Sequence, residues 1–351
     1  MSIQEAKDAL DHVLKKSRVH LYKPIQIAEI LYHDRVVEPL DLLDLETYRS
    51  KSKKWRDDMC IALLGRVSTS SSKFQDDLFN AIPAPLLSEM GQYNRTHNGA
   101  VEAYIYEAFS AKHSQLSQAL NDCFHARKET FEVQTFLSSF WQEAGLRRSL
   151  DKIYEIVVYS LFFTLTEALD LTVEISINEN KLDLVSEFED FTKSVMCLDF
   201  NHPSYIQNAR VYRVGVTNAA DRGLDMYSNW GPVIQIKHLS LNPELAENIV
   251  SGVSSDKIVI VCKDAEKAVI VSLLTQIGWK SKIQSIITEA DLVRWYEKGL
   301  RGKYASAMGD RLLAVLRKAI AEEFPSVDET PDILKRRHYD SSVDSFWTQA
   351  I

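Results

Sequence analysis

The sequence predicts an α/β fold, in which helices flank a mixed central β-sheet and a mainly helical region forms the N-terminal part. Apolar residues recur at helical spacing over most of residues 1–145. From about residue 149, short β-branched runs alternate with helical patterns, as is typical of a sheet covered by helices. We therefore expect a helical region at 1–145 and an α/β domain at 146–351. Glycine and proline are sparse, so no flexible linker marks the boundary.

The elements of the helical region follow from apolar periodicity. Residues 3–16 and 23–35 each place apolar side chains on one helix face, and Pro24 suits a first helical turn. Helical pattern continues over residues 41–64 and 100–145. Residues 65–74 are polar and predict a loop.

The second region begins with residues 149–170, which are apolar almost all round and predict a buried helix. Further helices are predicted at 181–196, 265–278, 289–300 and 304–323. Strands are predicted at 171–177, 209–216, near 225, and at 232–239, 257–262 and 283–288.

Composition is that of an ordinary globular protein, with 45% hydrophobic and 26% charged residues. No apolar run approaches the length of a membrane span, and residues 1–16 do not resemble a signal peptide. Cys60, Cys123, Cys197 and Cys262 lack metal or redox spacing. We therefore expect free buried thiols and a cytoplasmic location.

The formal net charge of −8 argues against a passive, charge-driven nucleic-acid binder. It leaves room for an enzyme that holds nucleic acid in a local basic groove. Residues 47–73 are locally basic, with seven Lys/Arg against two acidic residues. A run of this kind is also common on a solvated helix face.

One group of polar residues in the sequence is suited to catalysis. On a strand at 232–239, Gln235 and Lys237 point to one face while Ile234 and Ile236 point to the other. A lysine on a central strand is costly to bury without a carboxylate or a ligand nearby. Asp225 lies ten residues before Gln235, a distance that suits a hairpin-like return, so its carboxylate can meet both polar side chains.

These groups are suited to a metal-assisted hydrolysis. Mg²⁺ prefers oxygen ligands, which the Asp225 carboxylate, the Gln235 amide and the Ile236 backbone carbonyl would supply. The metal would acidify a bound water and neutralise a phosphate, while Lys237 would orient that water or stabilise developing negative charge. The alternative is a surface hairpin in which Lys237 simply forms a salt bridge, and spacing alone leaves both interpretations open.

The stretch "DRGLD" followed by "QIK" resembles the D-x-G-x-D…Q-x-K pattern of Mrr-like nucleases of the PD-(D/E)xK superfamily. The match covers Asp221, Gly223, Asp225, Gln235 and Lys237. The resemblance implies a restriction-endonuclease-like core in which the second aspartate and the Q-x-K strand form the metal site. Asp221 is either a further ligand or, more often at such a place, a turn-capping residue beside a permissive glycine.

The same resemblance implies a glutamate from an upstream helix, and Glu155 is the only charge within residues 153–163. It is either a metal-site acid, which we favour, or a residue that reaches solvent from a helix end. Gln235 departs from the acidic residue usual in the wider superfamily. The substitution removes one negative charge and makes a second tightly bound metal less assured.

Longer segments, residues 19–35, 65–79, 218–226 and 231–241, resemble type II restriction endonucleases of the HaeII kind. That resemblance spans nearly the whole chain. It implies Mg²⁺-dependent cleavage of duplex DNA at a short GC-rich palindrome, RGCGCY, within a restriction-modification system. It also implies a cognate DNA methyltransferase as a functional partner without direct binding.

A GC-rich target favours arginine, whose guanidinium can bond O6 and N7 of guanine. Candidate DNA contacts lie beside the polar loop, in the "YNRTHNG" stretch and beside the catalytic strands: Arg66, Ser70, Lys73, Asn94, Arg95, Arg210, Arg213 and Arg222. A palindrome read by a chain without internal repeats predicts a homodimer.

Two other functions stay open: a nuclease with the same core acting on modified or structured DNA, and a non-catalytic DNA-binding module. The intact Asp225, Gln235 and Lys237 count against the second. Dinucleotide-binding and P-loop glycine motifs are absent from the sequence, which disfavours an unrelated nucleotide-using enzyme.

Overall fold

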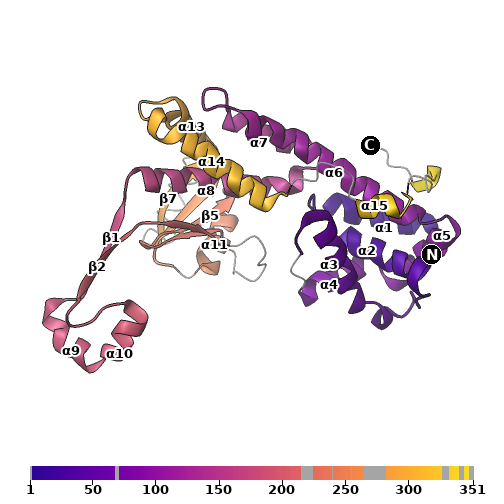
Figure 1. Ribbon diagram of the computed structural model, residues 1–351, viewed down its shortest axis with the longest axis horizontal. Coiled ribbons are helices and arrows are strands. Elements are labelled where there is room, and N and C mark those ends of the chain that lie inside the picture. The colour runs from indigo at the N-terminus through magenta and orange to yellow at the C-terminus, as the bar shows by residue number, and fades with distance from the viewer. Residues whose placement is uncertain are drawn as a thin grey trace.

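The predicted mixed α/β class is confirmed by the computed structural model, in which a five-stranded mixed sheet is flanked by helices and joined to a helical body (Figure 1). The structure describes residues 2–67, 71–214, 224–238, 240–253, 255–264, 282–325, 332–339 and 344–347. The predicted helix at 265–278 lies outside these residues. In the described part of the chain, none of the helices has the length and apolar character needed to cross a membrane.

The helical body is built around its own hydrophobic cluster. Its helices are α1 (Ile3–Lys16), α2 (Tyr22–Tyr32), α3 (Lys51–Leu64), α4 (Ser72–Ala81), α5 (Ala84–Thr96) and the first half of α6 (Ala100–His125). The predicted bounds of α1 are confirmed, because Ser2 and Glu5 cap it reciprocally and Ser17 ends it. The C-terminal part returns here: α15 (Asp332–Arg336) and η8 (Ser345–Trp347) pack on this cluster.

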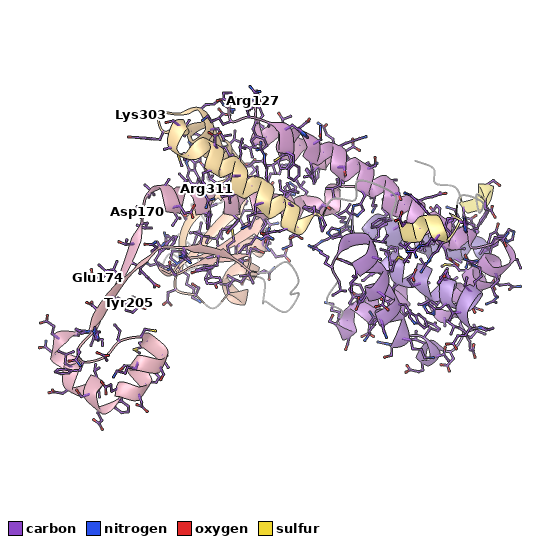
Figure 2. All side chains as sticks on the ribbon, viewed as in Figure 1. Arg127, Asp170, Glu174, Tyr205, Lys303 and Arg311 are labelled. Carbon is purple, nitrogen blue, oxygen red and sulfur yellow. The ribbon has the colours of Figure 1, made fainter. Side chains whose placement is uncertain are left out.

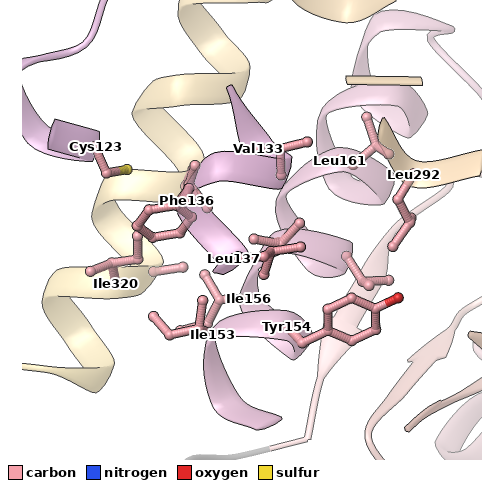
Figure 3. Packing of buried hydrophobic residues seen from close by; sticks show 14 of the residues in the cluster. Cys123, Val133, Phe136, Leu137, Ile153, Tyr154, Ile156, Leu161, Leu292 and Ile320 are labelled. Carbon is pink, nitrogen blue, oxygen red and sulfur yellow. The ribbon is translucent and has the colours of Figure 1, made fainter. Parts of the chain in front are cut away.

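A second cluster lies between the sheet and five helices, namely the second half of α6, α7 (Val133–Gln142), α8 (Leu150–Ala168), α13 (Glu289–Arg301) and α14 (Ala305–Glu323) (Figure 3). The predicted burial of α8 is confirmed, since Ile153, Tyr154 and Ile156 are fully buried. On the opposite face of the sheet, α11 (Pro243–Gly252) covers a smaller cluster. The sequence analysis did not predict α11.

The sheet has the order β3 (Val211–Arg213), β4 (Met226–Ser228), β5 (Val233–Lys237), β6 (Ile258–Cys262) and β7 (Ile283–Thr288). The first three strands pair antiparallel, and β5, β6 and β7 pair parallel. Met226 faces Ile234 in the register, and both side chains enter the cluster under α8. Gln235 and Lys237 therefore point to the other face, as the alternation predicted.

Residues 169–208 form an arm that leaves the end of α8 and projects from the sheet (Figure 1). Its stem pairs β1 (Thr172–Ser176) antiparallel with β2 (Ser204–Asn208), and its end holds α9 (Leu182–Glu187) and α10 (Glu189–Phe191). The predicted continuous helix at 181–196 is wrong, because short helical turns replace it. The predicted strand at 209–216 is likewise wrong in extent, since β2 ends before it and β3 covers only three residues of it.

Short helical segments complete the described chain: η1 (His33–Val37), η2 (Leu45–Thr47), η3 (Arg147–Ser149), η4 (Glu179–Lys181) and η5 (Thr192–Met196). Cys60, Cys123 and Cys262 are free and buried as predicted. Cys197 is free but exposed, which corrects the prediction, because it lies at the end of the arm, where little packs. The domain boundary near 145 stays a prediction, since α6 contributes side chains to both large clusters.

Candidate active site

Asp225 precedes β4 and interrupts the pairing between β4 and β5. The last pair of the ladder is Met226 and Ile234. Beyond that pair, the Asp225 side chain provides the hydrogen-bond acceptor that a paired strand would otherwise supply. Its Oδ2 accepts a 2.7 Å hydrogen bond from the Ile236 backbone N–H. Lys237 Nζ lies 3.8 Å from the same oxygen. The structure therefore brings together the carboxylate and the ammonium that the sequence analysis paired.

The backbone of β5 also offers an oxygen at this place. The Val233 N–H donates to Lys257 O on the β6 side at 3.0 Å. Successive residues of a strand direct their N–H and C=O groups to alternate sides, and both groups of one residue point the same way. The Ile236 carbonyl consequently points with its N–H toward Asp225, as the sequence analysis required of a metal ligand.

Gln235 precedes Ile236 on β5, and the residue is only 2% exposed. Its amide Nε2 is buried and has no hydrogen-bond partner among the described residues. A buried polar atom without a partner is costly, so it marks a position where a ligand atom would be favourable. The nitrogen and oxygen of an amide exchange by a half-turn, which makes Gln235 equally able to present its carbonyl oxygen.

Glu155 supplies a second buried carboxylate from α8, with 5% of the residue exposed. Lys152 Nζ donates to its Oε2 at 2.5 Å, and Arg213 Nε lies 3.7 Å from its Oε1. Lys152 was missed in the sequence analysis, although its spacing three residues before Glu155 is that of a helical ion pair. The structure leaves Glu155 within a charged cluster rather than at a solvated helix end.

The two carboxylates share an electrostatic environment that favours an added cation. Burial raises the pKa of Glu155, the Lys152 and Arg213 cations lower it in part, and the Asp225 charge raises it again. Burial likewise raises the pKa of Asp225, against the lowering effect of Lys237. Each carboxylate is thus held charged at a cost that a cation beside it would offset.

The residues fit a divalent cation that keeps several of its waters. No group of three or more His, Cys, Asp or Glu side chains is arranged around a metal within the residues that the structure describes. The donors on or beside β5 are instead one carboxylate, one amide and one backbone carbonyl, and the charge of Asp225 also acts on the Glu155 carboxylate of α8. Such hard oxygen donors, few in number, suit Mg²⁺ better than a soft or fully caged metal.

Two of the predicted DNA contacts, Arg66 and Arg213, are engaged in an internal chain of ion pairs. Arg213 Nη2 lies 3.2 Å from Glu323 Oε2, and Arg66 Nη2 lies 4.0 Å from Glu323 Oε1. Arg66 also donates to the Glu322 carbonyl at 3.1 Å and to the Tyr22 hydroxyl at 3.2 Å. The sequence analysis missed Glu323, which ties the sheet to the helical body.

The remaining predicted contacts differ in accessibility. Asn94 is fully buried and donates to Glu102 at 2.6 Å. Arg95 pairs with Asp34 but keeps 44% of its side chain exposed. Lys73 and Arg210 are exposed, and Arg210 lines a groove of about 750 Å³ beside β3 and α8. Ser70, Asp221 and Arg222 lie outside the described residues.

Comparison with known proteins matches residues 6–339 to the HaeII restriction endonuclease family. The type II restriction enzyme HaeII of Haemophilus aegyptius is 56% identical over 346 residues, covering 97% of this chain and 98% of that protein. The type II restriction enzyme NgoBI of Neisseria gonorrhoeae is 54% identical over 348 residues, covering 98% and 99%. No solved structure matches the chain.

Proposed function

The chain belongs to the HaeII restriction endonuclease family, as a site-specific type II DNA endonuclease of a restriction system, and we propose that Asp225, Gln235 and Lys237 form its Mg²⁺-dependent active site. One observation carries this proposal. The Asp225 carboxylate accepts from the Ile236 N–H and lies 3.8 Å from the Lys237 ammonium, and the same strand carries Gln235, whose buried amide nitrogen has no partner among the described residues. This arrangement supports a metal-assisted hydrolysis of a phosphodiester.

In the proposed site, the Asp225 carboxylate, the Gln235 amide oxygen and the Ile236 carbonyl would hold Mg²⁺, with Glu155 as a further candidate ligand. When bound, the cation supplies charge neutralisation at the phosphate and a more acidic water. Lys237 orients the attacking water and donates to the phosphate oxygen on which negative charge develops. Water attacks phosphorus, the bond to the leaving oxygen breaks, and the products are a phosphate monoester and a hydroxyl.

The proposed target is a short GC-rich palindrome in duplex DNA, RGCGCY. Lys73, Arg95 and Arg210 support contacts to that DNA, since each presents exposed cationic surface. Arg66 and Arg213 serve this proposal less well, since both are paired with Glu323. Asn94 would first have to leave its buried bond to Glu102. We retain Ser70, Asp221 and Arg222 as predictions.

We further propose that the enzyme acts as a homodimer in the cytoplasm, with one active site on each DNA strand. A twofold target matches a twofold protein, because the same side chains then meet the same bases on both strands. A cognate methyltransferase would protect the host's own sites by modifying the DNA, without binding this chain.

Plasmid digestion tests the function directly. The protein is incubated with plasmid DNA in Mg²⁺ and, in parallel, in EDTA, and the fragment ends are sequenced. We expect discrete fragments in Mg²⁺ only, with ends that share one palindrome. Cleavage in EDTA would contradict the metal-dependent site. A smear in Mg²⁺ would contradict sequence specificity, and ends sharing a different sequence would contradict the proposed target.

A further inference from the structure

The arm at residues 169–208 has no role in the active site just described, yet it is continuous with it. It leaves from α8, which carries Glu155, and returns to β3, which carries Arg213. Figure 2 shows Asp170, Glu174 and Tyr205 along its stem, well away from the helical body. Whatever binds the arm is therefore linked by two short connections to elements of the catalytic cluster.

The surface of the arm is unusually apolar. Of nineteen large hydrophobic residues exposed in the described chain, nine lie within these forty residues. Their exposed fractions run from 41% to 72%, and they are Leu169, Leu171, Leu184, Phe188, Phe191, Val195, Met196, Phe200 and Ile206. The arm contributes no side chain to the three hydrophobic clusters. Apolar surface gathered in this way is characteristic of a binding interface.

Charge identifies the class of partner. The arm has eight acidic residues against two lysines, a net charge of −6 within the chain's −8. Such a surface repels the phosphate backbone, so DNA is disfavoured as the occupant. The rest of the chain has 39 basic and 41 acidic residues and is nearly neutral. An acidic, apolar arm is thus suited to a protein surface, and two arms would repel one another if they met directly.

The size of the patch matches one side of a stable dimer. Nine large side chains that are about half exposed present on the order of 800 Å² of apolar surface, taking for each a value near the lower end of the roughly 150–250 Å² of an aromatic side chain. A standard interface buries about 800 Å² on each partner. In a twofold dimer each arm would contact the other subunit, so the symmetry would bury both copies of the patch.

We propose that the arm at residues 169–208 is the dimerisation element of this enzyme and docks on the body of a second copy of the chain. The inference rests on the proposed function in one respect: cleavage of a palindrome on both strands calls for two joined active sites. The arm then holds two catalytic clusters in a fixed relation through α8 and β3.

Sedimentation velocity, without DNA or metal, tests this proposal. We expect the wild-type protein to sediment with twice its 40.0 kDa chain mass and Phe188→Ser/Phe191→Ser to sediment as one chain at the same concentration. The matched control is Leu43→Ser/Ile61→Ser, two comparably exposed residues of the helical body, which should stay dimeric. A monomeric wild-type protein, or a dimeric arm variant, would overturn the proposal.

A second variant guards against misfolding. Thr172 and Asn208 are cross-strand partners, so an Asn-Gly turn can join them and replace residues 173–207. This shortened protein should melt as the wild type does, because the three clusters keep all their residues, and it should be monomeric. An arm variant that stays dimeric but binds DNA more weakly would identify the arm as a DNA clamp instead. The mass measured by sedimentation does not depend on DNA cleavage. A failed plasmid digestion would therefore contradict the proposed function without affecting this test of the arm.

Discussion

The helical body and the candidate active site both bury carboxylates, but they treat them differently. In the body, Glu29 accepts from two nitrogens of Arg337 at 2.6 and 3.0 Å, and also from the Tyr106 hydroxyl. Glu102 accepts from two nitrogens of Arg35, both at 2.9 Å. These carboxylates have complete sets of partners, and bidentate arginine pairs of this kind fix geometry.

The site at the sheet is incomplete by comparison. Among the residues that the structure describes, Asp225 has a single backbone donor and a lysine at 3.8 Å, and the buried amide nitrogen of Gln235 on β5 has no partner. A fully satisfied network stabilises one conformation, whereas a carboxylate with few donors can still accept an added cation. We infer from this difference that the buried charges of the body serve the fold, whereas those beside β5 have the incomplete set of partners that the proposed catalytic role requires.

The largest effect should come from Lys237→Met. The side chain is 32% exposed, so its removal should leave stability and DNA binding nearly unchanged. The rate of cleavage should fall by roughly 10²–10³-fold, the usual loss when one group that stabilises transition-state charge is removed. Single-turnover cleavage and gel-shift assays measure the two properties. The matched control is Lys257→Met, which replaces an exposed lysine just before β6 and should leave the cleavage rate unchanged.

Breaking the body's network should instead destabilise the fold. In Arg337→Met the Glu29 carboxylate stays buried without its cation, which should cost about 3–5 kcal/mol of unfolding free energy in urea titrations. The protein that remains folded should cleave at the wild-type rate. Arg294→Met removes a solvent-exposed ion pair and should cost less than about 1 kcal/mol. Equal losses in the two variants would contradict the structural assignment.

Two buried histidines should make the fold acid-sensitive. Burial lowers the pKa of His113 to about 4 and that of His20 to about 3. Below pH 6.5 the unfolded chain binds protons that the fold excludes, so stability falls as the pH falls toward these values. His113 alone should account for about 2–3 kcal/mol between pH 7 and pH 4.5. In urea titrations His113→Leu should show a shallower fall, and an unchanged pH dependence would contradict this account.

Cleavage should have its own acid limit. Burial raises the pKa of both Asp225 and Glu155, and only their charged forms attract a cation. The cleavage rate should therefore begin to decline at a pH above about 4, where ordinary carboxylates titrate. Below that point the rate should fall by about tenfold per pH unit. Cleavage rates of the His113→Leu variant, measured at pH values at which it is fully folded, separate this acid limit from unfolding. A rate that stays constant down to pH 4 would show that neither carboxylate binds the metal.

Gln235→Glu should have the smallest effect. The substitution restores the acidic residue usual in the wider superfamily and adds a negative charge beside Asp225. The Mg²⁺ concentration for half-maximal cleavage should fall, by about tenfold or less, because an added carboxylate strengthens binding of a hard cation. Gln235→Leu is the opposite variant and should need more Mg²⁺. No change in either variant would show that residue 235 only aligns its neighbours.

Local pattern was enough to predict much of the fold. Apolar periodicity locates α1, α8 and α13, and β-branched runs locate β6 and β7. The pairing of Asp225 with Lys237 followed from strand alternation and hairpin length. These features depend on residues close together in the chain.

The parts of the fold and site that were not predicted depend on contacts between residues far apart in the sequence. Arg213 meets Glu323 across 110 residues, and neither position indicates its partner. The segment 181–196 has helical periodicity, yet it packs on no cluster that would hold a long helix together, and it breaks into short turns. The exposure of Cys197 follows from the same lack of packing.

Our central proposal is that a divalent cation is the missing partner of the Asp225 carboxylate. Mn²⁺ binding by the wild-type protein and by Asp225→Asn, followed by electron paramagnetic resonance, tests it most directly. Asparagine retains an oxygen that can accept the Ile236 N–H, so the fold should melt unchanged. We predict that the variant loses at least about tenfold in Mn²⁺ affinity, together with cleavage, as the loss of one charged ligand implies. Equal affinity in the two proteins would contradict the assignment of Asp225 as the metal ligand.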